Sequence, residues 1–348
     1  MKNKNKKIVI GLSGGIDSSM SAYLLQQEGY EIEGIYMKLH NVVDGYHEKN
    51  IKFIDQVTNF LGISYKIIDL TKEFGDDVYD YFVQSYIDGI TPNPCVRCNA
   101  KIKFGKLFEE AMRMGADYLA TGHYVKTDGK FLYKADDLTK DQSYFLAQID
   151  KEVIPKLIFP MSIYTKEFIK QEASKIPVLE QIAAQKESQE ICFVENSYID
   201  ILNKHININQ EGKTLDIDGN VVGHHKGYMH YTVGKRRGFY VHGAHEPHYV
   251  ISQNKENNTI TVGKKEKLAI NYVVVDKLNM FVDDDKIQCD VKLRFRSTTV
   301  KCDLVIDKVK DQATIKLHNP IYGVAVGQTA VFYQDDKVLG SGWIIETK

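Results

Sequence analysis

The stretch from residue 7 to residue 28 places two glycines, a carboxylate and two hydroxyls between a strand and a helix. Its sequence is KIVIGLSGGIDSSMSAYLLQQE, in which an apolar run of strand length stops at Ser13 and a helical apolar pattern follows. Backbone N–H groups at a helix start bind anions, and glycines admit a phosphate where a Cβ would block it. Asp17 would repel that phosphate unless a cation such as Mg²⁺ lay between them. The stretch therefore predicts a phosphate-binding loop with a metal, the alternative being a tight strand–helix turn.

Strands and helices alternate through the first 125 residues. The predicted strands are 7–12, 31–37, 64–70 and 116–123, and the predicted helices are 18–28, 48–62, 71–89 and 101–115. This alternation is typical of a parallel sheet covered by helices on both faces. A hairpin is predicted to turn at Asp128-Gly129, and residues 140–205 are predicted to be mostly helical.

The composition and periodicity of the sequence change near residue 205. Short runs rich in Val, Ile, Tyr and Thr then recur between turn signals, which indicates small sheets or barrels. We therefore predict an α/β protein in three parts. They are a nucleotide-binding parallel-sheet domain over 1–205, a central β-rich domain over 206–267 and a β-barrel-like domain over 268–348.

Composition and charge exclude some classes of protein. No apolar run approaches the ~18–20 residues of a membrane span, so no membrane association is expected. Five cysteines in 348 residues indicate reduced thiols and a cytoplasmic protein rather than a disulfide scaffold. The net charge of −1 gives no overall attraction for nucleic acid. Two local basic runs could attract nucleic acid, the alternative being that each is a solvated basic face. The first run contains Lys226, Lys235, Arg236 and Arg237, and the second contains Lys292, Arg294, Arg296 and Lys301.

The segment TPNPCVRCNAKIKFG holds Cys95 and Cys98 in C-x-x-C spacing. A structural zinc site would need a second close pair of ligands, which the scattered remaining cysteines do not supply. Thioredoxin-like redox chemistry is a second alternative. Because Cys98 precedes a predicted helix and has basic neighbours, we expect it to favour the thiolate form. Cys192, in ICFV, is by its own pattern a core residue.

The string SGGIDSS resembles the PP-loop of the N-type ATP pyrophosphatases, which adenylate their substrates. The loop alone does not choose among the members of that class, which include synthetases acting on small molecules. TPNPCVRCNAKIKFG, ADYLATGHYV, KDQSYFLAQ, SQEICFV, YTVGKRRGF and VGQTAVFY follow it in the order found in the tRNA-specific 2-thiouridylase family. The resemblance covers nearly the whole chain.

The resemblance implies ATP-dependent 2-thiolation of the wobble uridine of tRNA, with tRNAs for Lys, Glu and Gln as expected substrates. ATP adenylates the 2-carbonyl oxygen, and sulfur arrives as a persulfide on Cys192 from a cysteine desulfurase or a sulfur-relay protein. Cys98 then closes the cycle as a Cys98–Cys192 disulfide. Asp17 is implied to hold Mg²⁺ against the pyrophosphate, and the chain is expected to be a monomer.

The resemblance also assigns binding residues by position. Those expected at ATP are Gly11, Leu12, Ser13, Gly14, Gly15, Ile16, Asp17 and Ser18, with Met37 and Gly122 near the adenine and ribose. Those expected at the tRNA are Asn93, Pro94 and Cys95 at the target base, and His123, Lys140, Asp141, Gln142, Arg296 and Gln328 elsewhere.

Two features depart from the family pattern. Many members have Asp where this chain has Cys95. The alternatives for Cys95 are a spare thiol, a contact to the base, or a third ligand of an iron–sulfur cluster. We rank the cluster second. The segment after Met37, KLHNVVDGYHEKN, is less acidic and shorter than usual, which puts its family contacts in doubt. A small-molecule synthetase and a non-catalytic RNA-binding protein remain as competing functions.

Overall fold

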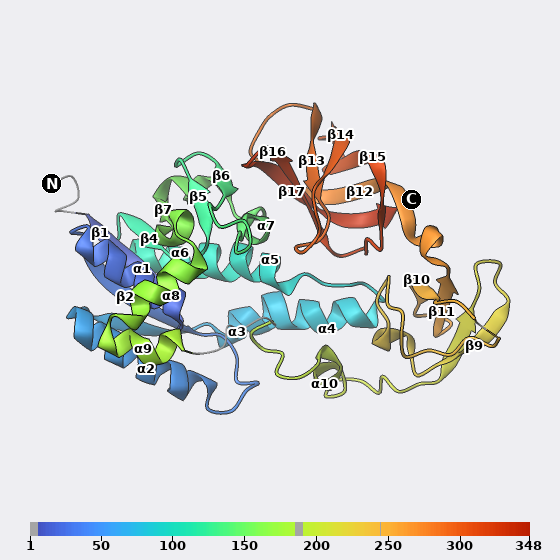
Figure 1. Ribbon diagram of the computed structural model, residues 1–348, viewed down its shortest axis with the longest axis horizontal. Coiled ribbons are helices and arrows are strands. Elements are labelled where there is room, and N and C mark those ends of the chain that lie inside the picture. The colour runs from blue at the N-terminus through green and yellow to red at the C-terminus, as the bar shows by residue number, and fades with distance from the viewer. Residues whose placement is uncertain (1–5, 185–190, 244) are drawn as a thin grey trace. The chain divides into compact units, whose positions relative to one another are not determined.

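The computed structural model describes residues 6–184, 191–243 and 245–348 (Figure 1). The chain forms two compact units, each built from several segments. The first contains Met1–Val78, Cys95–Phe193 and Asp336–Val338, and the second contains Tyr79–Pro94, Val194–Asp335 and Leu339–Lys348. Each unit is described by itself.

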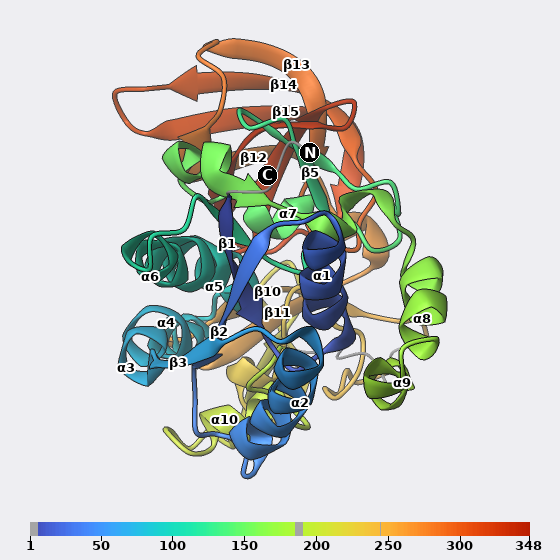
Figure 2. The same ribbon diagram turned by 90° about the vertical axis from the view of Figure 1, so that its left-hand side faces the viewer.

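A five-stranded parallel sheet forms the centre of the first unit, in the order β3-β2-β1-β4-β7. Its strands are β1 (Lys7–Leu12), β2 (Glu31–Lys38), β3 (Tyr65–Asp69), β4 (Tyr118–Ala120) and β7 (Leu157–Ile158). The middle of β1 is inaccessible to solvent, as expected for a strand covered on both faces. Figure 2 shows α1 and α2 on one face of this sheet and α6 on the other. The predicted α/β fold class is confirmed.

The first two helices of the first unit lie close to their predicted positions, whereas only the start of the helix predicted over 71–89 belongs to this unit. The helices of the unit are α1 (Ile16–Gln27), α2 (Tyr46–Leu61), α3 (Thr71–Phe74), α6 (Leu107–Arg113), α7 (Ser143–Leu146), α8 (Lys166–Ser174) and α9 (Pro177–Ala183). Thr165 caps α8 by accepting a hydrogen bond from the N–H of Phe168, and proline at the first position starts α9. The hairpin β5 (Val125–Thr127) and β6 (Leu132–Lys134) turns at Asp128-Gly129, as predicted.

The helix that follows the C-x-x-C segment begins earlier than predicted. It starts as α5 (Pro94–Cys98), continues through a π-helical stretch (Asn99–Lys106) and ends with α6. Proline suits the first helical position because its missing N–H would have no partner there. Cys95 and Cys98 therefore lie inside the helix, and the prediction that they occupy the preceding loop is wrong.

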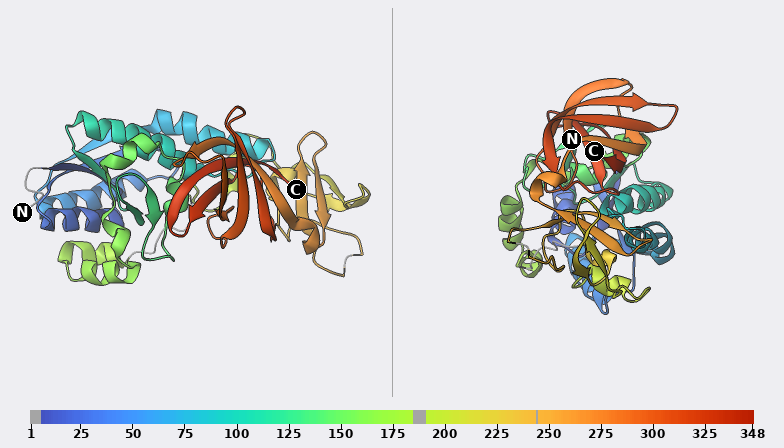
Figure 3. Two further views of the ribbon diagram at one scale, coloured as in Figure 1. Left: turned by 90° about the horizontal axis from the view of Figure 1, so that it is seen from above. Right: turned by 90° about the vertical axis from the view of Figure 1, so that its right-hand side faces the viewer.

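Two β structures fill most of the second unit. One is a sheet in the order β10-β11-β8-β9, made of β8 (Gly212–Leu215), β9 (Val221–His225), β10 (Tyr249–Asn254) and β11 (Thr259–Gly263). The other is a barrel, drawn in orange to red in Figure 3, in which β12 pairs with both β15 and β17 and so closes the ring. Its strands are β12 (Ala269–Met280), β13 (Lys286–Lys292), β14 (Val300–Asp307), β15 (Gln312–Tyr322), β16 (Thr329–Gln334) and β17 (Lys337–Thr347).

Two helices, α4 (Asp80–Ile87) and α10 (Tyr198–Leu202), also belong to the second unit, where Tyr86 and Tyr198 stack with ring centroids 4.4 Å apart. Alternate residues of the barrel strands, such as Val273, Val291 and Ile315, are buried inside it. Among the helices in the described part of the chain, none combines the length and apolar character needed to cross a membrane.

Candidate active site

The glycine loop lies at the carboxyl end of β1, between that strand and the start of α1. Gly14 has a φ of +76°, which favours glycine, and a Cβ there would lie 3.0 Å from the backbone of Asn50. The Ser18 hydroxyl accepts a hydrogen bond from the N–H of Ser13 (3.1 Å) and lies 3.1 Å from the carbonyl of Gly15. These bonds hold the loop in a fixed shape. Open α/β sheets bind their ligands at this edge, and β1 and β4 flank the point where the strand order reverses.

Asp17, in the first turn of α1, forms a partly buried ion pair that sequence analysis missed. Both of its carboxylate oxygens lie 2.6 Å from Nζ of Lys166, the first residue of α8. The Lys166 side chain is only 9% exposed, and the hydroxyl of Tyr124 donates a third hydrogen bond to Asp17 at 2.9 Å. Lys166 lies 149 residues from Asp17 in sequence, and nothing in its local pattern distinguishes it from a surface lysine. A phosphate that enters the loop therefore meets a cation already held at the carboxylate.

The segment that follows β4 connects the loop to a second group of polar residues. A Cβ on Gly122 would lie 2.8 Å from the backbone of Asp17, so only glycine fits against the start of α1. The next residue, His123, is buried, with Nδ1 2.8 Å from the Thr121 hydroxyl and Nε2 3.5 Å from Nζ of Lys103. Burial and the charge of Lys103 hold the pKa of His123 well below its usual range. His123 is therefore neutral near pH 7.

Three of the five cysteines gather in the first unit. Cys98 is buried, Cys95 is half-buried and Cys192 is exposed, and all three are free thiols. They are close enough that a charge on Cys192 raises the pKa of both Cys95 and Cys98. Lys103 acts in the opposite direction on each of the three. The structure therefore brings Cys192 to the C-x-x-C helix around one lysine.

The expectation that Cys98 favours the thiolate form is wrong for the ligand-free chain. Burial raises its pKa to about 12, and the charge of Lys103 offsets only part of that effect. Burial likewise raises the pKa of Cys95 to about 11. The surrounding protein also desolvates the Cys192 thiol and raises its pKa above the ordinary value, although part of this residue remains in contact with solvent. The physical reason is the early helix start, which places Cys98 on a buried turn rather than at a solvated helix end.

We predict that Cys98 alkylates slowly in the ligand-free protein. At a pKa near 12, thiol exceeds thiolate on the order of 10⁴-fold or more near pH 7.5, and thiolate is the reactive form. Iodoacetamide labelling followed by peptide mass spectrometry should therefore give a rate for Cys98 at least about 100-fold below that for exposed Cys192. Equal rates for the two thiols at pH 7.5 would contradict this picture of the site.

Aromatic rings and a neutral histidine surround Cys192. Its neighbour Phe193 packs edge-on against Phe74 and His40, with centroid separations of 5.5 and 6.4 Å. Burial and the adjacent His47 lower the pKa of His40 to about 4, although the backbone of Cys192 opposes this shift. Burial raises the pKa of Tyr46, and the charge of Cys192 adds to that increase. The segment after Met37, where the sequence departs from the family pattern, thus forms a wall beside Cys192. The first three residues of SQEICFV lie outside the described residues.

Met37 and the KDQ residues complete the predicted positions in the first unit. Met37 is next to last in β2, one residue beyond the partner of Leu12, so it lies beside the glycine loop. Asp141 is buried and accepts hydrogen bonds from the N–H of Ala135 and from the Ser143 N–H and hydroxyl. Gln142 accepts one from the N–H of Tyr124 at 2.9 Å. Asp141 and Gln142 thus brace the hairpin and the segment after β4, whereas Lys140 is half-buried.

Four predicted substrate-binding residues belong to the second unit. Gln328 donates from Nε2 to the carbonyls of Thr91 and Pro92, at 3.1 and 2.9 Å. The side-chain amide of buried Asn93 lies 3.4 Å from the hydroxyl of Thr329. Gln328 thus fixes the chain just before Asn93 and Pro94. Arg296 is exposed in the segment between β13 and β14.

Asp17, beside the glycine loop, fits a Mg²⁺ ion that carries bound phosphates. Mg²⁺ often takes only one or two protein carboxylates and completes its shell with phosphate oxygens and water, which Asp17 beside the loop would allow. Within residues 6–184, 191–243 and 245–348, no three His, Cys, Asp or Glu side chains are grouped to hold a metal ion.

Family models match the chain in three consecutive segments. They are described as a tRNA methyl transferase HUP domain (residues 6–196), a tRNA methyl transferase PRC-barrel domain (199–264) and an aminomethyltransferase beta-barrel domain (269–344). The chain is 58% identical over 345 residues to the tRNA-specific 2-thiouridylase MnmA 1 of Aliarcobacter butzleri, with 99% of each chain covered.

Two further relatives carry the name tRNA-specific 2-thiouridylase MnmA. The relative from Sulfurimonas denitrificans is 51% identical, covering 98% of this chain and 99% of its own. The relative from a Nitratiruptor species is also 51% identical, covering 98% of this chain and 100% of its own. The resemblance seen in the motifs is confirmed, and identity at this level over nearly full length means that the chain belongs to the tRNA-specific 2-thiouridylase family.

Proposed function

We propose that this chain is a tRNA-uridine 2-sulfurtransferase that uses ATP to thiolate the wobble uridine of tRNA. The observation that carries the proposal is the segment Gly122–Tyr124. It packs on the start of α1 through Gly122, hydrogen-bonds Asp17 through Tyr124, and faces Lys103 through His123. One short segment thus joins a phosphate loop to a group of three thiols. A small-molecule synthetase or a passive RNA-binding protein would need no such connection.

The glycine loop would bind ATP through its backbone N–H groups, the Ser13 and Ser18 hydroxyls and the dipole of α1. Asp17 would hold Mg²⁺, which when bound neutralises phosphate charge. Lys166 is positioned to move from Asp17 to a phosphate oxygen, because its Nζ is already within hydrogen-bond distance of the carboxylate that the metal would take. The 2-carbonyl oxygen of uridine then attacks the α-phosphate, pyrophosphate leaves, and the base oxygen becomes part of an AMP leaving group.

Sulfur transfer would use the thiol pair Cys192 and Cys98. A donor protein of the cysteine desulfurase or sulfur-relay class loads Cys192 as a persulfide, Cys192–S–SH. Its terminal sulfur attacks C2 of the base and displaces AMP, and the Cys98 thiolate then attacks the Cys192 sulfur to release 2-thiouridine. Alternatively, Cys98 first releases sulfide, which attacks C2. Either route leaves a Cys98–Cys192 disulfide, which a dithiol reductant returns to two thiols.

The high pKa of Cys98 gives its step a physical requirement. Its thiol must lose a proton when the substrate is in place, and Lys103 is the cation present to stabilise the resulting charge. Neutral His123, 3.5 Å from Lys103, does not compete with it as a second positive charge. Cys95 remains a spare thiol in this scheme. The working unit is a monomer of the enzyme with tRNA bound.

The proposal is tested by incubating the full chain with ATP, a persulfide donor and unmodified tRNA, and then analysing tRNA digests by mass spectrometry. We expect 2-thiouridine at the wobble position, with one AMP formed per base. Pyrophosphate–ATP exchange without tRNA but with a small amine or acid substrate would instead indicate a small-molecule synthetase. Tight tRNA binding with neither AMP nor 2-thiouridine would indicate a passive RNA-binding protein.

We predict that Arg296 supplies a phosphate contact in tRNA binding. It is exposed on the barrel and forms part of a basic run, so Arg296→Gln should lower the slope of log K against log salt by about one unit. Lys308→Gln is the matched control, because Lys308 is also exposed on the barrel but is paired with Asp285 at 2.6 Å. Binding isotherms at several salt concentrations measure the slopes. An unchanged slope for Arg296→Gln would mean that this arginine faces solvent in the complex.

A further inference from the structure

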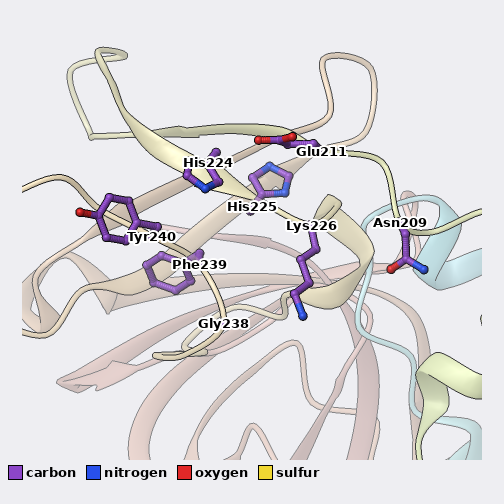
Figure 4. Close-up of a pocket in the computed structure, with 8 residues that line it drawn as sticks. All are labelled: Asn209, Glu211, His224, His225, Lys226, Gly238, Phe239 and Tyr240. Carbon is purple, nitrogen blue, oxygen red and sulfur yellow. The ribbon is translucent and has the colours of Figure 1, made fainter.

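A cavity of about 600 Å³ lies beside β9 in the second unit, and its lining contains none of the residues discussed above as catalytic or nucleotide-binding (Figure 4). Its lining consists of Asn209, Glu211, His224, His225, Lys226, Gly238, Phe239 and Tyr240. From this lining we infer that the cavity binds one unpaired nucleobase of the tRNA, outside the wobble position. The inference rests on the proposed function, since it takes tRNA to be the substrate.

The cavity wall is fixed by the backbone rather than by side chains alone. The N–H of Tyr240 donates to the carbonyl of His224 (3.1 Å), and that of His242 donates to Val222 (2.7 Å), which ties this segment to β9. A Cβ on Gly223 would lie 1.9 Å from the carbonyl oxygen of Tyr240, so only glycine permits this approach. The wall is therefore preformed, as ligand sites usually are.

One end of the cavity presents ring faces. Figure 4 shows the rings of His224, Phe239 and Tyr240 gathered there, with Lys226 and Asn209 toward the other end. The His224 and Tyr240 ring centroids are 5.7 Å apart, and 53% of Tyr240 is exposed. A large exposed aromatic residue in a cavity is a platform for base stacking, which tolerates any base because every base has a π face.

The polar groups of the lining favour the hydrogen-bonding edge of a base inside the cavity and the phosphate backbone of the tRNA outside it. Glu211 carries a carboxylate that accepts hydrogen bonds only, so it would repel a phosphate and suits the amino or imino N–H of a base. Lys226 in the lining is exposed, and Arg236 and Arg237 in the adjoining loop are exposed as well. A base with an exocyclic amino group can therefore enter while its phosphates stay on these cations.

The test measures binding of an unmodified tRNA transcript to the full chain at several salt concentrations. Tyr240→Ala should weaken binding about 10-fold, within the range for loss of one stacked base, without changing the salt slope. Tyr240→Phe keeps the ring and should bind like the wild type. Lys226→Gln should instead lower the slope by about one unit. Phe60→Ala, which removes a comparably exposed ring (52%) from α2 in the other unit, is the control and should change nothing.

Chemical probing identifies the base and separates this inference from the proposed function. One unpaired nucleotide outside the wobble position should be protected by the wild type and Tyr240→Phe, and become reactive with Tyr240→Ala. If the wild type thiolates tRNA while Tyr240→Ala binds it with wild-type affinity, the inference is overturned and the proposed function stands. Unchanged tRNA binding by Tyr240→Ala with slower loading of Cys192 by the sulfur donor would also overturn it, and would assign the cavity to a protein partner.

Discussion

Replacement of Cys192 by serine is expected to abolish 2-thiouridine formation while adenylation of the tRNA continues. A hydroxyl cannot carry a persulfide, so no sulfur reaches the activated base, whereas the glycine loop, Asp17 and Lys166 are untouched. The loss should reach at least about 10³-fold, because removing a covalent nucleophile leaves only the background reaction. Mass spectrometry of tRNA digests measures the product, and AMP release measures adenylation in the same samples.

Cys98→Ser should give the same split between lost thiolation and retained adenylation, for a different reason. Without Cys98 the persulfide can load, but the bond between the Cys192 sulfur and the added sulfur cannot be broken by formation of a Cys98–Cys192 disulfide. Intact-mass analysis should therefore find the extra sulfur retained on Cys192, either as the persulfide or within an adduct to the tRNA. Cys289→Ser is the matched control, because Cys289 is also buried but lies on β13 in the other unit, 3.6 Å from Cys302. Thermal unfolding of each variant checks that a loss of activity is not a loss of fold.

Variants of Cys192 and Cys95 can contradict the sulfur relay in distinct ways. Thiolation that survives in Cys192→Ser would remove Cys192 as the sulfur carrier. Cys95→Ala should retain most activity, since Cys95 has no assigned step. Loss of activity in Cys95→Ala together with loss of bound iron would favour the cluster-dependent form of the reaction instead.

The second large effect is expected at the ion pair of Asp17 and Lys166. Lys166→Met should lower AMP formation by about 10²-fold or more, because a cation aimed at developing phosphate charge is a major source of rate enhancement. Asp17→Asn should be similarly defective, since it removes the carboxylate proposed to hold Mg²⁺. tRNA affinity should stay near wild type in both, as neither residue is among those assigned to the tRNA. AMP release and tRNA binding measured side by side test this.

A control next to the same helix separates the role of Lys166 from its effect on stability. Lys175, just past the end of α8, is exposed and paired with Glu172, so Lys175→Met should leave AMP formation unchanged. Lys166→Arg preserves the charge and should recover part of the activity. Full AMP release by Lys166→Met would reduce this lysine to a structural partner of Asp17, and full release by Asp17→Asn would remove the phosphate-loop assignment.

Local patterns in the sequence were sufficient for the parallel sheet and the glycine loop. Apolar periodicity located β1 to β4 and their helices. A strand covered on both faces and an amphipathic helix each have a characteristic spacing of apolar residues, which can be recognised within a few neighbouring positions. The string SGGIDSS likewise carries its phosphate-binding geometry locally, through glycine freedom at Gly14 and the hydroxyl of Ser18. The family resemblance depended on the order of several such strings along the chain.

Tertiary structure alone decided the electrostatics of the site. The sequence marked Cys98 as a thiolate from nearby basic residues, but burial inside the helix outweighed their charge and raised its pKa to about 12. Lys166 and Asp17, 149 residues apart, meet only because α8 packs against α1. Similarly, Lys103 acts on Cys192 only in the folded chain. Solvation and charge–charge energies depend on distance and burial in space, which a linear pattern does not encode.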